Sequence, residues 1–533
     1  MSLYTLTLLD TTGIQDYIFS SNRLQENIGA SELVYRATSL WVFDALDKLK
    51  ISHNIHRHSN GLDWEFTDAA IENDSNLQAE VIQAAGGNTL ILFRNRDQAI
   101  GFVKKLTLRL LKEAPGLTVL AQHADFDFAK DKLTDARLRL EDAIRIHKLS
   151  RLGSAQTFGL SVTGECESTG LPAVNTLNGS LLVEGKVEPL GLEGEDGDTL
   201  VSSGTAAKRA WRGQANRRLR SWLKLAADDF DFPYDLEKIG RVKGEESYVA
   251  VIHADGNRMG QHVKDVATGT KTNREYIKAT RDFSKKINDI SLAALQTIVS
   301  LTVQAVKNGD IPFELNKQDK PYLPLRPLVF GGDDVTFVCN GDIGVEVAAA
   351  YLEKFHGEAQ ARGLNFHASA GVSIVKMHYP FARAYKLSEE LTESAKSLTR
   401  NVDCSALDWH FAQSGLSGSL KNIRDREFKV KDGQLNLRPL TLEDWSAFES
   451  IMEEFNGEYW GTKHNKVIGL RQPLRDGSHA VEKYRLDFGL GELPKFNGLD
   501  VQKTGWLNSI CYYFDAVELL DHHVSLKNKE VAK

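Results

Sequence analysis

A turn of two glycines and two aspartates lies within a regular order of predicted strands and helices. Residues 247–255 (SYVAVIHAD) are an apolar run rich in β-branched residues, which predicts a buried strand. Helical periodicity follows over about 275–308, and the stretches PLRPLVF and VTFVC then predict two strands joined by the turn GGDD at 331–334. A further helix leads to a strand at 366–375. The order β-α-β-β-α-β predicts a ferredoxin-like fold, the arrangement that palm domains of polymerases and cyclases use.

The N-terminal part of the chain shows the same order more faintly. Its elements are a strand at 4–10, a helical region at about 22–49, two strands within 79–93 around Gly86 and Gly87, a helix at about 97–114 and a strand from 117. Both copies place 76 positions between the aspartate that ends the first strand and the glycine of the turn: Asp10 to Gly86, and Asp255 to Gly331. Equal spacing with equal element order indicates an internal duplication.

The two copies differ at the turn. With an offset of 245 residues, Asn88 stands in the place of Asp333 and Thr89 in the place of Asp334. The first copy therefore keeps the fold pattern and one carboxylate, Asp10, but loses the acidic pair. We expect it to be degenerate.

A chain of 533 residues is too long for one ordinary core. We expect an α+β protein with a first palm domain at 1–125, an inter-palm linker and helical region at 126–245, a second palm domain at 246–385, and a mostly helical C-terminal domain at 386–533. Each palm should be ferredoxin-like.

Composition bears on nucleic-acid binding, on the cellular compartment and on membrane association. The net charge of −7 gives no global basic field for nucleic acid. The 4 cysteines include no CxxC pair, which is typical of the reducing cytoplasm. No apolar run approaches the ~18 residues that cross a bilayer, so we expect no membrane association. The N-terminus reads as a strand and not as a signal peptide.

A basic helix is predicted at 208–224, with the sequence KRAWRGQANRRLRSWLK. Its lysines and arginines could contact RNA phosphates. They could equally form a solvated face while Trp211, Leu219 and Trp222 pack inward. The sequence leaves both alternatives open.

The acidic turn has a chemical interpretation. Asp333 and Asp334 repel each other unless a cation is present, and Asp255 ends the strand expected beside them. Three carboxylates at strand ends suit Mg²⁺ or Mn²⁺, which also bind triphosphate oxygens and assist phosphoryl transfer. Gly331 and Gly332 would let a nucleotide approach the backbone. The alternative is an ordinary polar hairpin turn, where Gly and Asp are common.

Several stretches of the sequence resemble the large polymerase-like subunit of type III CRISPR effector complexes, a family with two palm domains of which the second carries GGDD. The stretches are DTTGIQDYIFSSNRLQENIGASELV, AAGGNTLILF, GECESTGLPAV, YVAVIHADGNRMG, VFGGDDVTF and ASAGVSIVKMHYPFARAYKLSEELTESAKS. The resemblance covers residues 1–410.

The resemblance implies a reaction and a site. Active members of this family convert ATP to cyclic oligoadenylates in antiviral defence when target RNA is bound. Carried over to this chain, it implies the catalytic metal ligands Asp255, Asp333 and Asp334 for Mg²⁺ or Mn²⁺. It implies a nucleotide site at Gly256, Asn257, Gly331, Gly332 and Lys396, and an acceptor ATP site at Asp10, Gly86, Gly87 and Asn88. Other CRISPR effector subunits and guide or target RNA are the implied partners.

Two features of this family are not expected here. The chain starts directly at the first palm, so we expect no HD nuclease domain and no DNA cleavage. Thr169 stands at the CxxC position after Cys166, so the zinc site of the inter-palm segment is expected to be lost.

Two other functions compete with the cyclase. A catalytically silent scaffold subunit would bind guide or target RNA, but would have no physical need for three clustered carboxylates. A GGDEF-type diguanylate cyclase is less consistent with the sequence, because position 334 is Asp and Val335 follows it. The sequence fixes neither the base, nor the ring size, nor the activator.

Overall fold

The computed structural model describes residues 3–150, 162–225, 230–240, 247–311, 315, 320–412 and 418–526. Parts of the predicted inter-palm region (151–161, 226–229 and 241–245) therefore lie outside the described residues. The chain divides into two compact units, each built from several segments. Unit 1 comprises Met1–Ala227, Arg258–Asp289 and Leu328–Gly332, and unit 2 comprises Asp228–Asn257, Ile290–Pro327 and Asp333–Lys533.

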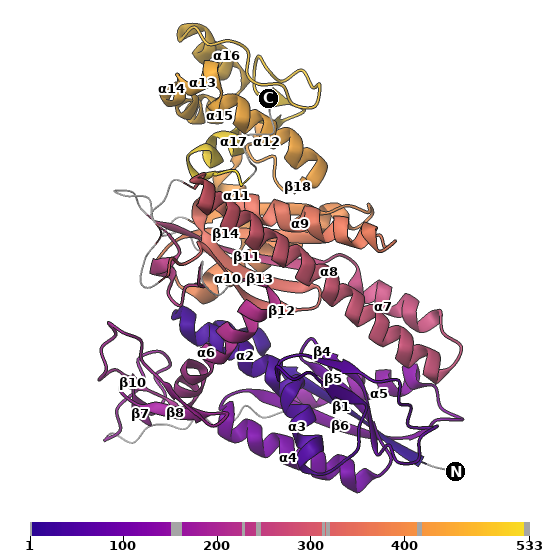
Figure 1. The fold of residues 1–533 in the computed structure, drawn as a ribbon. Coiled ribbons are helices and arrows are strands. Elements are labelled where there is room, and N and C mark those ends of the chain that lie inside the picture. Colours follow the sequence, from indigo (N-terminus) through magenta and orange to yellow (C-terminus); the bar gives the residue numbers. More distant parts are fainter. Residues whose placement is uncertain are drawn as a thin grey trace. The chain divides into compact units, whose positions relative to one another are not determined.

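The sheet of unit 1 has the strand order β4-β5-β1-β6 (Figure 1). Its strands are β1 (Leu3–Thr12), β4 (Ala79–Ala85), β5 (Asn88–Phe93) and β6 (Thr118–Asp127). All neighbours pair antiparallel. The first strand in the chain thus lies between the third and the fourth, which is the ferredoxin-like order that the sequence predicted.

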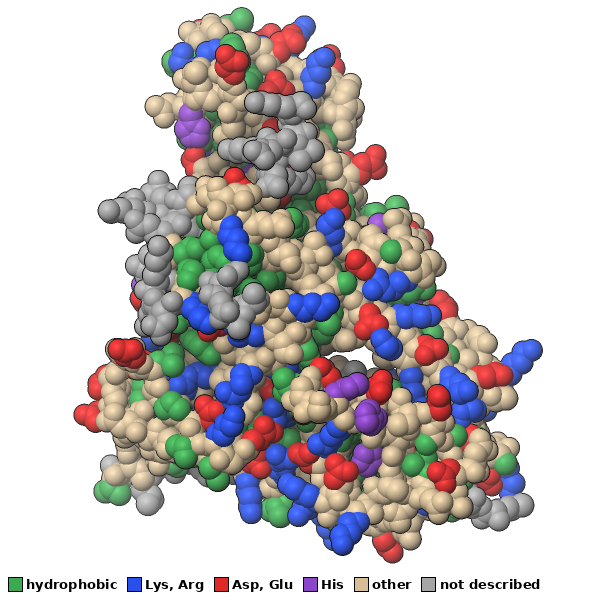
Figure 2. Space-filling view, in the orientation of Figure 1, with side chains coloured by type: hydrophobic (Ala, Val, Ile, Leu, Met, Phe, Trp, Pro, Cys, Tyr) green, Lys and Arg blue, Asp and Glu red, His purple; other side chains and the backbone are tan. Residues whose placement is uncertain are grey.

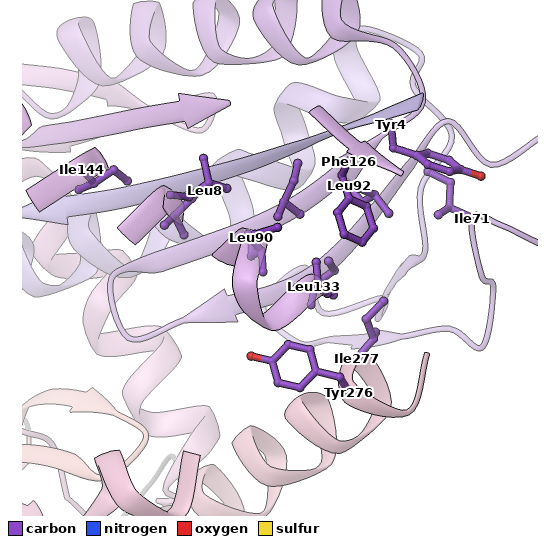
Figure 3. Packing of buried hydrophobic residues seen from close by; sticks show 14 of the residues in the cluster. Tyr4, Leu8, Ile71, Leu90, Leu92, Phe126, Leu133, Ile144, Tyr276 and Ile277 are labelled. Carbon is purple, nitrogen blue, oxygen red and sulfur yellow. The ribbon is translucent and has the colours of Figure 1, made fainter. Parts of the chain in front are cut away.

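One face of this sheet carries an apolar cluster (Figure 3). Leu6 and Leu8 of β1, which alternate with residues of the other face, pack with Leu140 and Ile144 of α5 (Leu133–Ser150). Tyr276, near the start of α8 (Asn273–Asn308), joins the same cluster. This face matters for function because Asp10 follows Leu6 and Leu8 at the same two-residue period.

The helices of unit 1 outside this cluster include a closely packed pair. The helices are α1 (Ile14–Phe19), α2 (Leu24–Thr38), α3 (Leu40–Lys48), α4 (Arg96–Glu113), α6 (Ser203–Trp222) and α7 (Met259–Thr268). Helices α2 and α6 cross so closely that a Cβ on Gly29 would lie 1.6 Å from the backbone oxygen of Lys208. Short strand pairs β2–β3 (Ile55–Arg57, Trp64–Phe66), β7–β10 (Asn175–Thr176, Leu200–Val201) and β8–β9 (Ser180–Val183, Lys186–Pro189) complete the unit.

The basic helix α6 is a core element and not a solvated face. Trp211 is buried, as one of the two alternatives has it, but so are Arg209 and Arg218. Arg209 Nε lies 3.0 Å from Glu26 Oε1, and Arg218 Nε lies 2.6 Å from Glu32 Oε2, with both acids on α2. Buried cations paired in this way hold helices together, so most of the charge of α6 is not presented to an RNA.

The second sheet, most of which belongs to unit 2, repeats the ferredoxin-like order and extends it: β12-β13-β11-β14-β15-β18. The strands are β11 (Tyr248–Gly256), β12 (Leu325–Gly331), β13 (Asp334–Asn340), β14 (Ala368–Lys376), β15 (Ala406–Ala412) and β18 (Leu440–Thr441). Strands β13 and β14 flank β11 antiparallel, and β15 adds to β14 in parallel. The strands predicted at 247–255, 324–330, 335–339 and 366–375 are all present.

Two helices cover opposite faces of this sheet. Gly344, the first residue of α9 (Gly344–Ala361), comes close to Ala250 of β11. Gly371 of β14 instead lies against the backbone of α10 (Phe381–Thr399), where its Cβ would be 2.2 Å from the Ser388 oxygen. Because side chains alternate along β11, His253 and Asp255 are on the face of α10, opposite to Ala250. This assigns α10 to the candidate site.

The boundary predicted at 385 falls inside α10, and β15 then joins the palm sheet. Beyond β15 the chain is mostly helical, with α11 (Leu420–Glu427), α12 (Leu442–Asn456), α13 (Glu458–Gly461), α14 (His464–Gly469), α15 (Arg471–Asp476), α16 (Ser478–Asp487) and α17 (Phe514–Leu519). A small sheet of β16 (Lys429–Val430), β17 (Gly433–Gln434), β20 (Ile510–Cys511) and β19 (Trp506–Leu507) was not expected.

Within the described residues, α8 is the one helix whose length and composition would allow it to cross a membrane. In its most apolar window 44% of residues are buried, and core helices of soluble proteins pass the same test. Ile290, Ala294 and Ile298 of α8 are fully buried. The apolar character of α8 is therefore accounted for by packing.

Candidate active site

Asp255 and the acidic hairpin lie side by side where strands β11 and β13 meet at their ends. Strand β11 pairs with β13 in a register that places Ala254 opposite Val335. The next pair in this register is Asp255 and Asp334. Asp333 precedes Asp334 in the turn, so the hairpin tip and the end of β11 bring three carboxylates together, as the sequence predicted.

The hairpin turn consists of Gly332 and Asp333, because β12 ends at Gly331 and β13 begins at Asp334. Gly332 has φ +80°, and Asp333 is not in the left-handed region. A positive φ at the first of two turn residues is typical of a type II′ turn. In the first palm both turn residues, Gly86 (φ +62°) and Gly87 (φ +80°), are left-handed, as in a type I′ turn.

The register corrects the alignment of the two copies. Asp10 of β1 is the partner of Asn88, and Asp255 stands level with Asp334. Asn88 therefore corresponds to Asp334, and Gly87 corresponds to Asp333. The equal spacing of 76 positions hid this shift of one residue, because Gly86–Gly87 is a turn pair whereas Gly331 still belongs to its strand.

The pKa values of Asp333 and Asp334 are both raised above the ordinary value of an aspartate. Burial, and then the charge of Asp255, raise the pKa of Asp333 to about 7. A hydrogen bond with the Asp255 carboxyl raises it further. The pKa of Asp334 is also raised to about 7, by burial and by the charges of Asp255 and Glu389. Carboxylates crowded in this way bind a proton or a cation more readily than isolated ones.

A lysine already serves as one cation of the cluster. Lys396 of α10 donates a hydrogen bond to Asp255 Oδ2, and its Nζ lies 3.7 Å from Glu393 Oε1. Burial acts to lower the pKa of Lys396, but the Asp255 carboxylate raises it overall. Lys396 is therefore a positively charged partner of Asp255.

His253 is a site residue that the sequence analysis missed. Its Nδ1 lies 3.4 Å from Asp334 Oδ1, and burial lowers its pKa, so that the ring is neutral near pH 7. Thr392 of α10 donates a hydrogen bond of 2.9 Å to the backbone oxygen of His253. The signal was available: His253 is a polar residue in an apolar strand, two positions before Asp255 and hence on the same face.

The donor set suits a hard divalent cation, although it is not assembled as a metal site. Within the part of the chain that the structure describes, no group of three or more His, Cys, Asp or Glu side chains is arranged to hold a metal ion. However, Asp334 Oδ1 is buried and accepts no hydrogen bond. A buried carboxylate oxygen that accepts no hydrogen bond, beside two further carboxylates, is what Mg²⁺ or Mn²⁺ would satisfy.

The loop after Asp255, where the resemblance implied a nucleotide site, is held by contacts within the protein. The Asn257 side chain is buried: it donates to the Cys404 oxygen at 2.9 Å and accepts from Ser369 Oγ at 2.9 Å. Its backbone N–H donates to the His367 oxygen, and Gly256 is paired within the sheet. Asn257 therefore fixes the end of β11, and a nucleotide contact of Gly256 and Asn257 stays a prediction.

The predicted acceptor site of the first palm carries its own ion pair. Lys148 of α5 lies 2.8 Å from Asp10 Oδ2 and 2.9 Å from Asp10 Oδ1. Asn88 lies opposite Asp10 in the sheet, directly after Gly86 and Gly87. The four predicted residues thus lie together at one sheet edge of unit 1, with a single carboxylate among them.

Comparison with known proteins identifies the domain that holds the acidic hairpin. Residues 248–403 match the family model "Cas10/Cmr2, second palm domain". This segment contains Asp255, Asp333, Asp334 and Lys396. The predicted resemblance to the large subunit of type III CRISPR complexes is thereby confirmed. Among curated proteins, none matches the chain.

Solved structures with a similar fold cover almost the whole chain. An apo Csm1–Csm4 cassette matches with a TM-score of 0.54 at 16% identity, over 97% of this chain and 70% of that chain. The cassette in complex with cA3 matches with a TM-score of 0.54 at 16% identity, over 97% and 69%. Csm1 of T. onnurineus matches with a TM-score of 0.51 at 15% identity, over 97% and 69%. At this identity the similarity establishes the fold, and the two-palm architecture is confirmed.

Proposed function

We propose, because residues 248–403 match the family model of the Cas10/Cmr2 second palm domain, that this protein is a metal-dependent nucleotidyltransferase. It would join ATP into cyclic oligoadenylates as a signal in CRISPR-type antiviral defence. The observation that carries the proposal is the position of Asp333 and Asp334 beside Asp255, with an unpartnered carboxylate oxygen among them.

Asp255, Asp333 and Asp334 would hold the divalent cation, Mg²⁺ or Mn²⁺. When bound, the cation would supply charge neutralisation on the triphosphate and activation of a 3′-hydroxyl. The neutral ring of His253 lies beside this carboxylate, with its Nδ1 3.4 Å from Asp334 Oδ1. Lys396, released from Asp255, is close enough to the same edge to contact phosphate oxygens.

Gly331 supports a nucleotide site at the hairpin. A Cβ built on it meets nothing within 4 Å, and its φ is an ordinary one. The fold itself therefore gives no reason for glycine at this position. Close approach of a ligand to the backbone is such a reason.

The similar structures suggest the substrate class and the partners. Complexes of the Csm1–Csm4 cassette contain AMPPNP, cA3 and cA4, and another structure is a Csm1–Csm4 subcomplex of the type III-A CRISPR-Csm interference complex. We therefore propose adenine nucleotides as substrates, a Csm4-like subunit with guide and target RNA as partners, and a cytoplasmic location.

The test is a product assay on the full chain. The protein is incubated with each NTP and Mn²⁺, with and without its RNA-guided complex, and products are resolved by mass spectrometry. The Asp333→Asn, Asp334→Asn double variant should yield no cyclic product while remaining folded, with a melting temperature in metal-free buffer no lower than that of the wild type. Cyclic product from the double variant would contradict the assignment of the hairpin.

One observation favours the alternative, a silent scaffold subunit. Asp255 is already neutralised by Lys396, which donates a hydrogen bond to its carboxylate. A scaffold would assemble into the RNA-guided complex and bind target RNA but give no product with any NTP. That combination of results would replace the cyclase with the scaffold.

A further inference from the structure

The outer face of α3 and α4 in unit 1 has features that no step of nucleotide chemistry uses. Leu108 is 51% exposed and Leu111 is 75% exposed. Three residues apart on a helix, they lie within about 60° of each other around the axis. Leu49, directly after α3, is 37% exposed. Single exposed leucines are common, but a group on one face marks an interaction surface.

A cavity of about 210 Å³ opens between the two helices. Leu108 lines it, and Leu49 and Leu111 adjoin the lining residues Lys48 and Lys112 along the chain. Its apolar lining includes Trp41, Ala45 and Leu106, all of them buried. The volume is below the ~300–1,000 Å³ typical of small-molecule sites. It suits instead an anchoring side chain of a protein partner. None of the candidate active-site residues lines it.

The charge around the cavity is positive once ion pairs are counted. Asp44 Oδ1 lies 2.7 Å from Arg57 Nη1, and Asp44 Oδ2 contacts Arg109. Glu113 Oε1 lies 3.0 Å from Arg109 Nε. Both carboxylates that line the cavity are therefore compensated.

Three lysines at the rim have no such partner. Within the described residues, Lys48, Lys105 and Lys112 make no ion pair, and all three are exposed. Figure 2 shows blue and green side chains next to one another over α4, at the lower edge of the view. An occupant with carboxylates at its edges would match this rim.

We propose that the α3–α4 face, defined by Leu49, Leu108, Leu111 and the three rim lysines, docks an acidic amphipathic segment of a partner protein. An apolar side chain of the partner enters the cavity, and its carboxylates pair with the lysines. Nucleic acid fits the face less well. Trp41 is fully buried under Arg109, whose guanidinium lies 4.6 Å from the ring centre, so no base can stack on it.

The proposal is independent of the catalytic assignment, and its test uses binding alone. The probe is a fluorescent helical peptide of about 16 residues with Leu at positions i, i+3, i+4 and i+7 and Glu elsewhere. A second peptide carries Lys in place of Glu. Anisotropy with the full chain should show binding of the Glu peptide and at least tenfold weaker binding of the Lys peptide, about 1.4 kcal/mol.

Variants locate the binding. Leu108→Glu with Leu111→Glu should weaken binding of the Glu peptide about tenfold or more, and Lys105→Glu should weaken it about threefold. The matched control is Leu138→Glu on α5, which is 59% exposed and lies outside the face. It should bind like the wild type. Unchanged melting temperatures would show that all variants fold.

Three results would overturn the proposal. The first is equal binding of the Glu and Lys peptides, and the second is an equal loss in the Leu138 control. The third is that oligouridylate RNA or phosphatidylserine vesicles, but not the Glu peptide, bind in a manner that depends on Leu108 and Leu111. That result would assign the face to RNA or to a membrane instead.

Discussion

Lys396 contacts Asp255 in the second palm, and Lys148 contacts Asp10 in the first palm in the equivalent position. In each palm the aspartate stands at the end of the central strand, and the lysine comes from the helix that follows the fourth strand of the fold. The duplication has thus kept an ion pair in both copies. Only the second copy adds the carboxylates of the turn. The two lysines therefore have equivalent aspartate partners, but only Lys396 has these further carboxylates nearby.

This difference predicts the effect of removing each lysine. Lys396→Met leaves three carboxylates without their internal cation, so the affinity for Mn²⁺ should rise by about tenfold, the equivalent of ~1.4 kcal/mol. The measurement is the Mn²⁺ concentration that gives half of the maximal shift in melting temperature, without nucleotide. With ATP present, the same variant should bind the triphosphate more weakly, because one phosphate partner is lost.

Lys148→Met is the matched control for this experiment. Beside Asp10 the first palm has Gly87 and Asn88, where the second palm has Asp333 and Asp334. Removal of Lys148 should therefore leave the Mn²⁺ midpoint unchanged. If both lysine variants behave alike, Lys396 does not compete with a cation, and the metal assignment of Asp255 is wrong. A lower Mn²⁺ affinity in Lys396→Met would have the same consequence.

The acidic pair predicts how stability depends on pH in metal-free buffer. In the unfolded chain an aspartate titrates near pH ~3.9, whereas in the folded protein the pKa values of Asp333 and Asp334 are about 7. Folding therefore favours the protonated forms. Their contribution to stability is complete below about pH 4 and is lost as the pH rises through about 7.

The double variant Asp333→Asn, Asp334→Asn removes this dependence. With EDTA, its melting temperature should exceed that of the wild type by about 1–3 °C at pH 8, and the gap should close toward pH 5. The expected gap is small because the Asp334 side chain is 35% exposed and solvent screens its charge. Mn²⁺ should stabilise the wild type only. A gap of the same size at every pH would contradict the assigned pKa shifts.

The two glycines of the hairpin should respond differently to alanine. Gly332 has φ +80°, where a side chain is strained, so Gly332→Ala should cost about 1–3 kcal/mol of unfolding free energy. Gly331 has an ordinary φ and open space around a Cβ, so Gly331→Ala should change stability by less than about 0.5 kcal/mol.

Turnover of ATP should distinguish Gly331→Ala from Gly332→Ala further. If a nucleotide approaches the backbone at Gly331, Gly331→Ala should lower turnover of ATP at least about tenfold without loss of stability. Denaturant unfolding and the product assay on the same preparation give both quantities. Full activity in Gly331→Ala would mean that the nucleotide does not approach this position.

The sequence was sufficient for the palm folds because their pattern is local. Buried strands, helical periods and glycine turns are all read from neighbouring residues, and the carboxylates at 255 and 333–334 follow from strand ends. The contacts of Asn257 were not predictable in this way. Its partners Ser369 and Cys404 lie more than a hundred residues away, and a polar residue after a strand looks the same whether it binds a ligand or the protein.

The basic helix shows the same limit. Seven cations within 208–224 indicated a charged surface, but charge counts along one helix contain no information about the acids opposite it. Glu26 and Glu32 occur in a stretch that looks like an ordinary amphipathic helix, and only the crossing of α2 and α6 brings them to Arg209 and Arg218. Burial of an ion network is a tertiary property.

The crossing of α2 and α6 gives the sharpest prediction for the fold. A Cβ on Gly29 would lie 1.6 Å from the backbone oxygen of Lys208. A backbone atom in a packed helix cannot move away without a large cost in free energy. Gly29→Ala should therefore cost about 3 kcal/mol or more of unfolding free energy. It should also separate Arg209 from Glu26.

Gly101→Ala is the matched control. Gly101 is inside α4, and a Cβ there meets nothing within 4 Å, so alanine should stabilise the helix by about 0.5–1 kcal/mol. Denaturant unfolding of the full chain, followed by the fluorescence of buried tryptophans such as Trp41 and Trp211 of unit 1, measures both variants. A Gly29→Ala variant within about 0.5 kcal/mol of the wild type would show that α2 and α6 do not cross at this distance. The cations of α6 would then be available to an RNA after all.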